Sequence, residues 1–294
     1  MKNKKFLFIT SAIYALVVLA VGLITQSAEA VMCASVPLVV TDLDPSRAAF
    51  ERIIETLKII NRIFGQQIIA SEGTLRSEQL IKADSSVYNF QTVQQNMNNI
   101  QGFPLQQGVD QNDVFIAKDG GLYLDHRVAE SSSVLLQSYV NPFQFTAANT
   151  NDVASLQAFY NGKLSYQVGS TVFIPGLNTA RFNKIPRTQQ SSANNYSEFD
   201  LRESQLRLAP YPVFSGKGTN KLTVEVAPYT GFDPAASSGQ NVVTLFFTGL
   251  TLQNASGFVD YFISPSKLQD AVMAWDEGVK KTGKADFTLK GPGA

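Results

Sequence analysis

Histidine and cysteine, two side chains that often carry acid–base and nucleophilic chemistry, each occur once in this chain of 294 residues. His126 follows Asp125, and such a pair could move a proton if both side chains faced one site. Adjacent residues of a strand point to opposite faces, however, so we expect no acid–base dyad and a surface or packing role for His126. Cys33 lies far upstream of the histidine, which argues against a Cys–His pair.

Other patterns that could hold a phosphate or a metal ion are incomplete. Gly216–Lys221 reads GKGTNK, but a phosphate loop needs wider glycine spacing and a Ser or Thr after its lysine. Asp42-Leu43-Asp44 lacks the glycine and the distal glutamate of a calcium loop. A single cysteine excludes an internal disulfide framework and a multi-cysteine zinc site. We therefore predict no catalytic residue, cofactor or metal site, and we expect the chain not to be an enzyme.

Charged residues are balanced and sparse. Lys and Arg together number 24, as do Asp and Glu, so the formal net charge is zero, and charged residues make up 16% of the chain. Ordinary soluble domains contain roughly 25%. The missing basic excess argues against specific nucleic-acid recognition. A weakly charged surface suits a protein that packs closely against its neighbours.

Residues 1–30 have the plan of a secretory signal or a membrane anchor. Three lysines precede an uncharged run from Phe6 to Ile24, and Ala28-Glu29-Ala30 fits a small-x-small cleavage site. As a helix, the run would span about 28 Å, close to the roughly 30 Å hydrocarbon core of a bilayer. Both interpretations remain open: a signal cleaved after Ala30, or a retained anchor with its lysines on the cytoplasmic side.

Residues 31–74 are expected to form a linker and an amphipathic helix. Asp44 can cap the helix, Pro45 suits its first position, and Gly65 suits its end. The spacing predicts an apolar stripe of about five turns. The stripe could pack on its own domain, or it could dock on a neighbouring subunit or a membrane surface. The candidate inter-subunit or membrane-facing residues are Phe50, Ile53, Ile54, Leu57, Ile60 and Phe64.

From Leu75 onward the pattern changes to short alternating runs separated by turn residues. Such spacing predicts antiparallel strands packed as a sandwich or barrel. We expect hairpin turns at Asp119-Gly120-Gly121 and at Gly169-Ser170, and a bulge or bend at Gly249. A polar stretch near 188–198 suggests a boundary between a first β-sandwich, 75–195, and a second β-rich part, 196–263.

Residues 264–294 are expected to form a C-terminal helix and a tail. Ser264-Pro265 is a cap followed by proline, and Gly283 suits the end of the helix. The tail that follows is predicted to be an arm or a frayed end. The apolar face of this helix supplies further candidate docking residues: Leu268, Val272 and Trp275.

Several stretches resemble jelly-roll capsid proteins of tailless viruses. Leu156–Pro186 contains YNGKL and two strand-like runs, and Leu208–Pro228 followed by Asn241–Asn254 is similar to a later strand pattern of that group. Ser77–Val93 and Asn112–Leu124 are similar to its opening strands. The resemblance implies the double-jelly-roll major capsid proteins of lipid-containing icosahedral bacteriophages, which form trimeric capsomers over an internal membrane.

Two functions are therefore expected from the sequence. In the first, the chain is mainly β, with one elaborated jelly roll or two in tandem between N-terminal and C-terminal helices. It assembles with copies of itself, as trimers within a virion shell, and can contact lipid. Residues 1–30 would then be an uncleaved anchor. In the second, the chain is an exported bacterial β-sandwich in the periplasm, on the cell surface or secreted, and it binds a surface ligand, a polysaccharide or an envelope protein.

Overall fold

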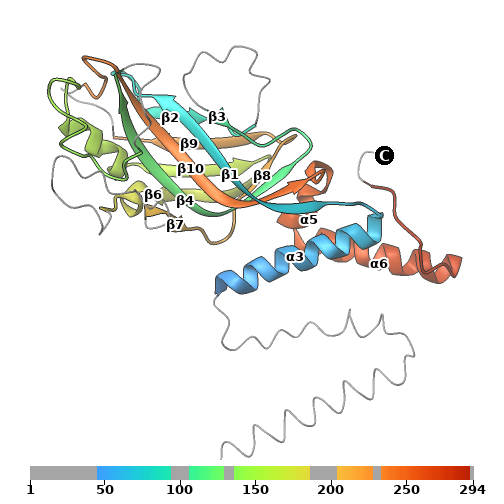
Figure 1. The fold of residues 1–294 in the computed structure, drawn as a ribbon. Helices are drawn as coiled ribbons and strands as arrows, with labels where there is room; N and C mark the ends of the chain where they lie inside the picture. The colour runs from blue at the N-terminus through green and yellow to red at the C-terminus, as the bar shows by residue number, and fades with distance from the viewer. Residues whose placement is uncertain (1–44, 94–105, 129–135, 186–203, 228–232, 292–294) are drawn as a thin grey trace, which may run out of the picture. The chain divides into compact units, whose positions relative to one another are not determined.

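The computed structural model describes residues 45–93, 106–128, 136–185, 204–227 and 233–291 (Figure 1). The predicted signal or anchor, Cys33, the Asp42–Asp44 motif and the polar boundary near 188–198 lie outside these residues. Residues 49–294 form one compact unit. Among the described helices, none has the length and apolar composition that crossing a lipid bilayer requires.

The strands form two antiparallel sheets, so the predicted mainly β, antiparallel class is confirmed. The first sheet has the order β3 (Gln106–Gln107), β1 (Ile69–Leu80), β10 (Gln240–Gln253), β4 (Val114–Arg127) and β7 (Leu206–Arg207), and β8 (Val213–Ser215) also pairs with β4. The second has the order β2 (Val87–Phe90), β9 (Asn220–Glu225), β5 (Lys163–Val168) and β6 (Thr171–Asn178).

Strands from the predicted first and second β-rich parts share both sheets. In the first sheet, β10 lies between β1 and β4. In the second, β9 lies between β2 and β5. The described strands therefore form one pair of sheets, and no second pair of sheets in tandem occurs among them.

The main core lies between the two sheets because their strands alternate as the sequence predicts. On β10, Val243, Leu245 and Phe247 point into this core, together with Leu122 and Leu124 of β4. The second sheet contributes a matching set of buried side chains: Tyr88, Phe90, Leu164, Tyr166, Leu222 and Val224.

The predicted hairpin at Asp119-Gly120-Gly121 is wrong, because β4 runs unbroken through these residues. A Cβ atom at Gly120 would collide with the ring of Phe247, so here glycine makes room for an aromatic neighbour rather than forming a turn. The turn at Gly169 is confirmed: it joins β5 to β6 with a positive φ of 55°. The irregularity predicted at Gly249 is also confirmed, by a register shift between β10 and β4.

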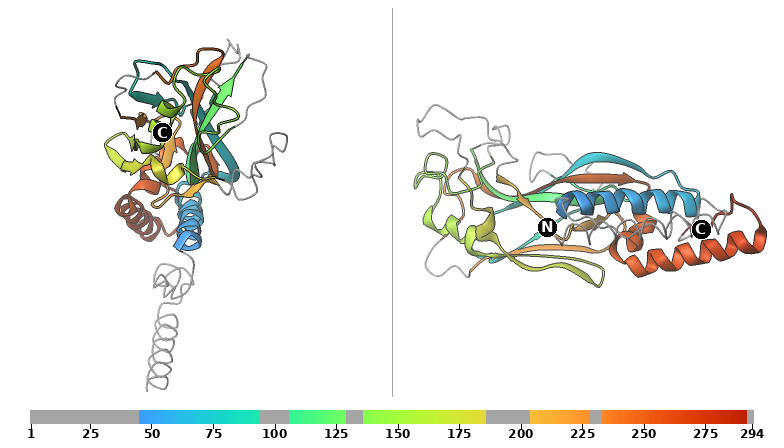
Figure 2. Two further views of the ribbon diagram at one scale, coloured as in Figure 1. Left: turned by 90° about the vertical axis from the view of Figure 1, so that its left-hand side faces the viewer. Right: turned by 90° about the horizontal axis from the view of Figure 1, so that it is seen from below.

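A second core lies where one end of the first sheet meets the helices (Figure 2). Helix α3 (Pro45–Phe64) and helix α6 (Pro265–Thr282) lie where the apolar spacing predicts helices, and the short α5 (Val259–Ile263) precedes α6. Short 3-10 helices complete the fold: η1 (Ala154–Asn161), η2 (Thr179–Phe182) and η3 (Ser256–Phe258). The sheet side of this core includes Val114 and Leu252.

Candidate functional site

The first sheet turns one face toward the second sheet and the other away from it, and this outer face carries an ionic cluster and a groove. Register pairs Thr74 of β1 with Thr248 of β10 and Asp119 of β4 across it. Along the strands the outer face has three zones. It is ionic and buried at one end, open in the middle, and apolar beneath α3 at the other end.

The ionic end is built around Arg127, whose side chain is only 1% exposed. Its two terminal nitrogens donate to the carboxylate of Glu78 at 2.8 and 3.0 Å, and its Nε donates to Asp125 Oδ2 at 2.5 Å. Arg76 also contacts Glu78, and Gln144 Nε2 donates to Asp125 Oδ1 at 2.8 Å. These contacts join β1, β4 and a loop.

The charges of this cluster satisfy one another. Burial alone would lower the pKa of Arg127, but its hydrogen bonds with Glu78 and Asp125 raise the pKa above its ordinary value. Nearby, burial raises the pKa of Tyr123 to about 12, while its hydrogen bond with Ser204 acts in the opposite direction. A permanently charged guanidinium saturated by carboxylates positions strands but supplies no proton near neutral pH.

His126 and Asp125 make separate contacts, as the strand alternation predicts. Asp125 bonds to Arg127, whereas His126 Nδ1 lies 2.8 Å from Asn241 Oδ1 on the neighbouring strand. The imidazole also lies edge-on to the ring of Phe145, at 6.4 Å between ring centres. The histidine is buried, so it has the packing role rather than the surface role.

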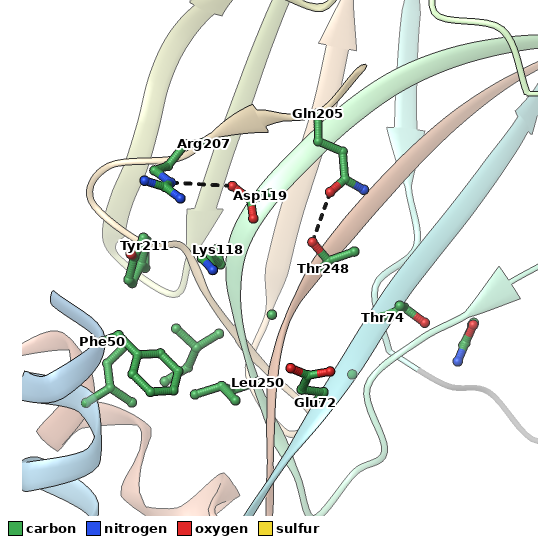
Figure 3. Close-up of a pocket in the computed structure, with 15 residues that line it drawn as sticks. Phe50, Glu72, Thr74, Lys118, Asp119, Gln205, Arg207, Tyr211, Thr248 and Leu250 are labelled. Carbon is green, nitrogen blue, oxygen red and sulfur yellow. Dashed lines mark hydrogen bonds and ion pairs between the residues drawn. The ribbon is translucent and has the colours of Figure 1, made fainter. Parts of the chain in front are cut away.

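The open middle of the outer face is a groove of about 890 Å³ (Figure 3). Phe50 of α3 and Leu250 of β10 lie at its apolar end, and polar side chains line the rest. Thr248 Oγ1 donates to Gln205 Oε1 at 3.0 Å, and Arg207 Nε lies 3.8 Å from Asp119 Oδ1. The groove also includes Glu72, Thr74, Gln107, Lys118 and Tyr211.

The predicted stripe of α3 divides between the second core and the groove. Leu57, Ile60 and Phe64 are buried in the second core, so the C-terminal half of the helix packs on its own domain. Ile53 is half-buried and lines the groove with Phe50, whose side chain is 37% exposed. Ile54 is also half-buried.

The predicted docking residues of α6 face the same second core. Leu268, Val272 and Trp275 are half-buried against it. The indole nitrogen of Trp275 donates to the Phe287 carbonyl at 2.7 Å, and the Arg62 guanidinium lies 5.1 Å from the Trp275 ring centre. Leu289 N–H donates to the Ile63 carbonyl at 2.9 Å. The described part of the predicted arm, up to Gly291, is therefore fastened to α3 and α6.

No family model, curated protein or solved structure matches the chain. Function must therefore be inferred from the topology and surfaces of the molecule itself. Within the described ranges, no group of three His, Cys, Asp or Glu side chains is placed to hold a metal ion.

Sequence reasoning missed both the ionic cluster and the groove. A weak sequence signal pointed to the cluster: Tyr123, Asp125 and Arg127 alternate with core residues on one strand and so share a face. A carboxylate and a guanidinium two residues apart on one strand could have indicated a buried pair. No sequence signal pointed to the groove, because its walls come from α3 and from strands of the first sheet that are distant in the sequence.

Proposed function

We propose that this chain is a self-assembling structural subunit of a viral capsid, built on one jelly roll. The strand order carries the proposal. A jelly roll has eight strands in two sheets. Seven of them are β1, β2, β4, β5, β6, β9 and β10, and the short strands β7 and β8, which both pair with β4, together form the eighth. Strand β3 is a short addition at one edge.

In a jelly roll the first strand pairs with the last, and the second with the second-to-last, which produces two interlocked Greek keys. The pairings of β1 with β10 and of β2 with β9 follow this scheme. So do the pairings of β10 with β4 and of β9 with β5. The order supports a single barrel, in contrast to the double barrel that the sequence resemblance implies.

Viral capsid subunits are a major class of jelly-roll proteins, and the surface composition favours that class here. Large apolar side chains that are exposed in an isolated chain gain free energy if assembly buries them against a partner. Such residues occur on several described elements: Phe50, Ile69, Val87, Val128, Phe143, Val172, Ile185 and Met273. With only 16% charged residues, copies can approach one another with little repulsion.

Sedimentation velocity and electron microscopy of the full chain test this proposal. We expect concentration-dependent association into trimers and larger shells or shell fragments. A single species at the 32.1 kDa chain mass, unchanged over a hundredfold range of concentration (about the range accessible to the method), would contradict it.

The groove favours a second candidate, an exported β-sandwich that binds a polysaccharide. Its volume of about 890 Å³ lies within the roughly 300–1,000 Å³ typical of ligand sites. Polar side chains beside Phe50 and Tyr211 suit the hydroxyls and apolar faces of sugars. Saturable glycan binding in calorimetry, lost in Phe50→Ala and retained in Met273→Ala, would support it. A mature protein lacking residues 1–30 by mass spectrometry would support export.

A further inference from the structure

We infer that Phe143 of one copy inserts into a slot beside β6 of a second copy, producing a head-to-tail contact. The inference rests on the proposed self-assembly and specifies one surface that would carry it. The donor is an aromatic side chain on a loop at the end of β4, and the acceptor is a separate surface formed by β6 and β7.

Phe143 is held outward by its neighbours. Its side chain is 60% exposed, whereas Asn141 and Phe145 on either side are buried. Its N–H donates to Asn141 Oδ1 at 2.9 Å, and Phe145 N–H donates to the Asn141 carbonyl at 2.8 Å. Gln144 bonds to Asp125 of the ionic cluster. Because the loop is fixed on both sides, the phenyl ring cannot be buried without rearranging the loop.

The slot has a volume of about 390 Å³ and lies where β6, an edge strand of the second sheet, approaches β7 of the first. Ile174, Leu177 and Leu206, which also pack against the main core, contribute apolar lining. Exposed Ala209 and Pro210 lie beside them. A phenyl ring, which buries about 150–250 Å² on full insertion, fits a slot of this size and lining.

The edge strand itself favours an inserted side chain over an added strand. Proline has no N–H to donate, and Pro175 lies within β6. A partner strand that paired along β6 would therefore lose a ladder hydrogen bond at this position. An aromatic ring that enters between the sheets needs no such bond.

Charge also matches between the two surfaces. Arg181 lines the slot, and Lys163 lies against Gly176 at its wall; Arg207, also in the lining, already pairs with Asp119. On the other surface, residues 136–161 and 233–239 contain two aspartates and no lysine or arginine. The two stretches are joined, since Asn151 Nδ2 donates to Asp233 Oδ2 at 2.8 Å. A basic rim facing an acidic loop favours association and fixes its orientation.

Because the ring and the slot are different surfaces, each copy can use both at once. Such a heterologous contact repeats, and it closes into a ring or extends, depending on the rotation between copies. A variant without the ring keeps its slot, and a variant with a blocked slot keeps its ring. Neither should propagate alone, but the two together should form a capped heterodimer.

Sedimentation velocity and native mass spectrometry of full-length Phe143→Ser and Ala209→Glu test this inference. Ala209 is exposed, so glutamate there places charge in the slot without filling the core. We expect each variant to self-associate at least about tenfold more weakly than the wild type, and their mixture to yield a one-to-one heterodimer that weakens with salt. Gln269→Ser, which removes an exposed polar side chain of α6, is the matched control and should associate normally.

The outcomes separate the inference from the function on which it rests. If the wild type stays monomeric, the proposed assembly itself fails. If the wild type assembles and either variant assembles equally well, the contact is overturned while the proposed function stands. The contact is also overturned if both variants weaken but their mixture forms no heterodimer. Circular dichroism of each variant shows whether it is folded before it is compared.

Discussion

The two ends of the outer face of the first sheet are buried by opposite chemistry. Strands β1, β10 and β4 run through both ends. At one end, Leu252 and Val114 lie in an apolar core with α3. At the other, Glu78 and Arg127 form an ion pair with almost no exposed surface. The same three strands therefore depend on apolar packing at one end and on paired charge at the other.

This difference has consequences for how each end responds to change. Apolar burial is graded, since the cost of a truncated side chain depends on its size and on how far the surroundings relax. A buried charge cluster has little tolerance, because removing one member leaves the others with too few partners away from water. The ionic end should therefore be the more sensitive to a single substitution.

The largest effect is expected from Arg127→Ala. The substitution leaves Glu78 and Asp125 without their shared partner, which should lower the free energy of unfolding by about 3–5 kcal/mol. Urea unfolding followed by circular dichroism measures the change. A loss below about 1 kcal/mol, the range of surface ion pairs, would show that the cluster does not stabilise this end.

Ile60→Ala tests the apolar end. Ile60 is fully buried in the second core, and truncating such a side chain costs about 2–5 kcal/mol. Alanine favours helix more than isoleucine does, so the measured loss will reflect packing rather than helix propensity. Lys58→Ala, an exposed change on the same helix, is the control and should leave the urea midpoint nearly unchanged.

Tyr123→Phe tests the ionic end through pH. Because burial raises the pKa of Tyr123 from 10.0 to about 12, the folded state favours the neutral phenol. The resulting stability is fully present below pH 10 and is lost as pH rises toward 12, by about 2–3 kcal/mol. The variant should lose less stability over this interval than the wild type. Equal slopes in the two proteins would mean that Tyr123 ionises as freely when folded as when unfolded.

The smallest effect is expected from Lys280→Ala. Lys280 pairs with Asp276 one turn earlier on α6, and its side chain is largely exposed. Exposed pairs of this spacing contribute very little to stability, and salt screens them. Thermal unfolding at low and high salt should give nearly the same midpoint for variant and wild type. A large change would indicate that α6 depends on its surface charges.

The spacing of apolar residues predicted helices and strands correctly where burial of one face determines the element. The apolar spacing of α3 and the alternation in β9 and β10 placed these elements correctly, because burial of one face sets the period. Asp119-Gly120-Gly121 failed because a turn signal and a need for space under Phe247 look alike in sequence. The groove was unpredictable, since it exists only once α3 lies over strands that follow it in the chain.

The central position of β10 bears on how the protein is made. Residues 240–253 lie between β1 and β4, which are translated long before them. While the ribosome is still adding residues 128–239, those two strands lack the neighbour that will join them. Their unpaired edges are then open to wrong partners. Closure of the first sheet is thus a late event in synthesis, and its long-range pairing favours slow folding.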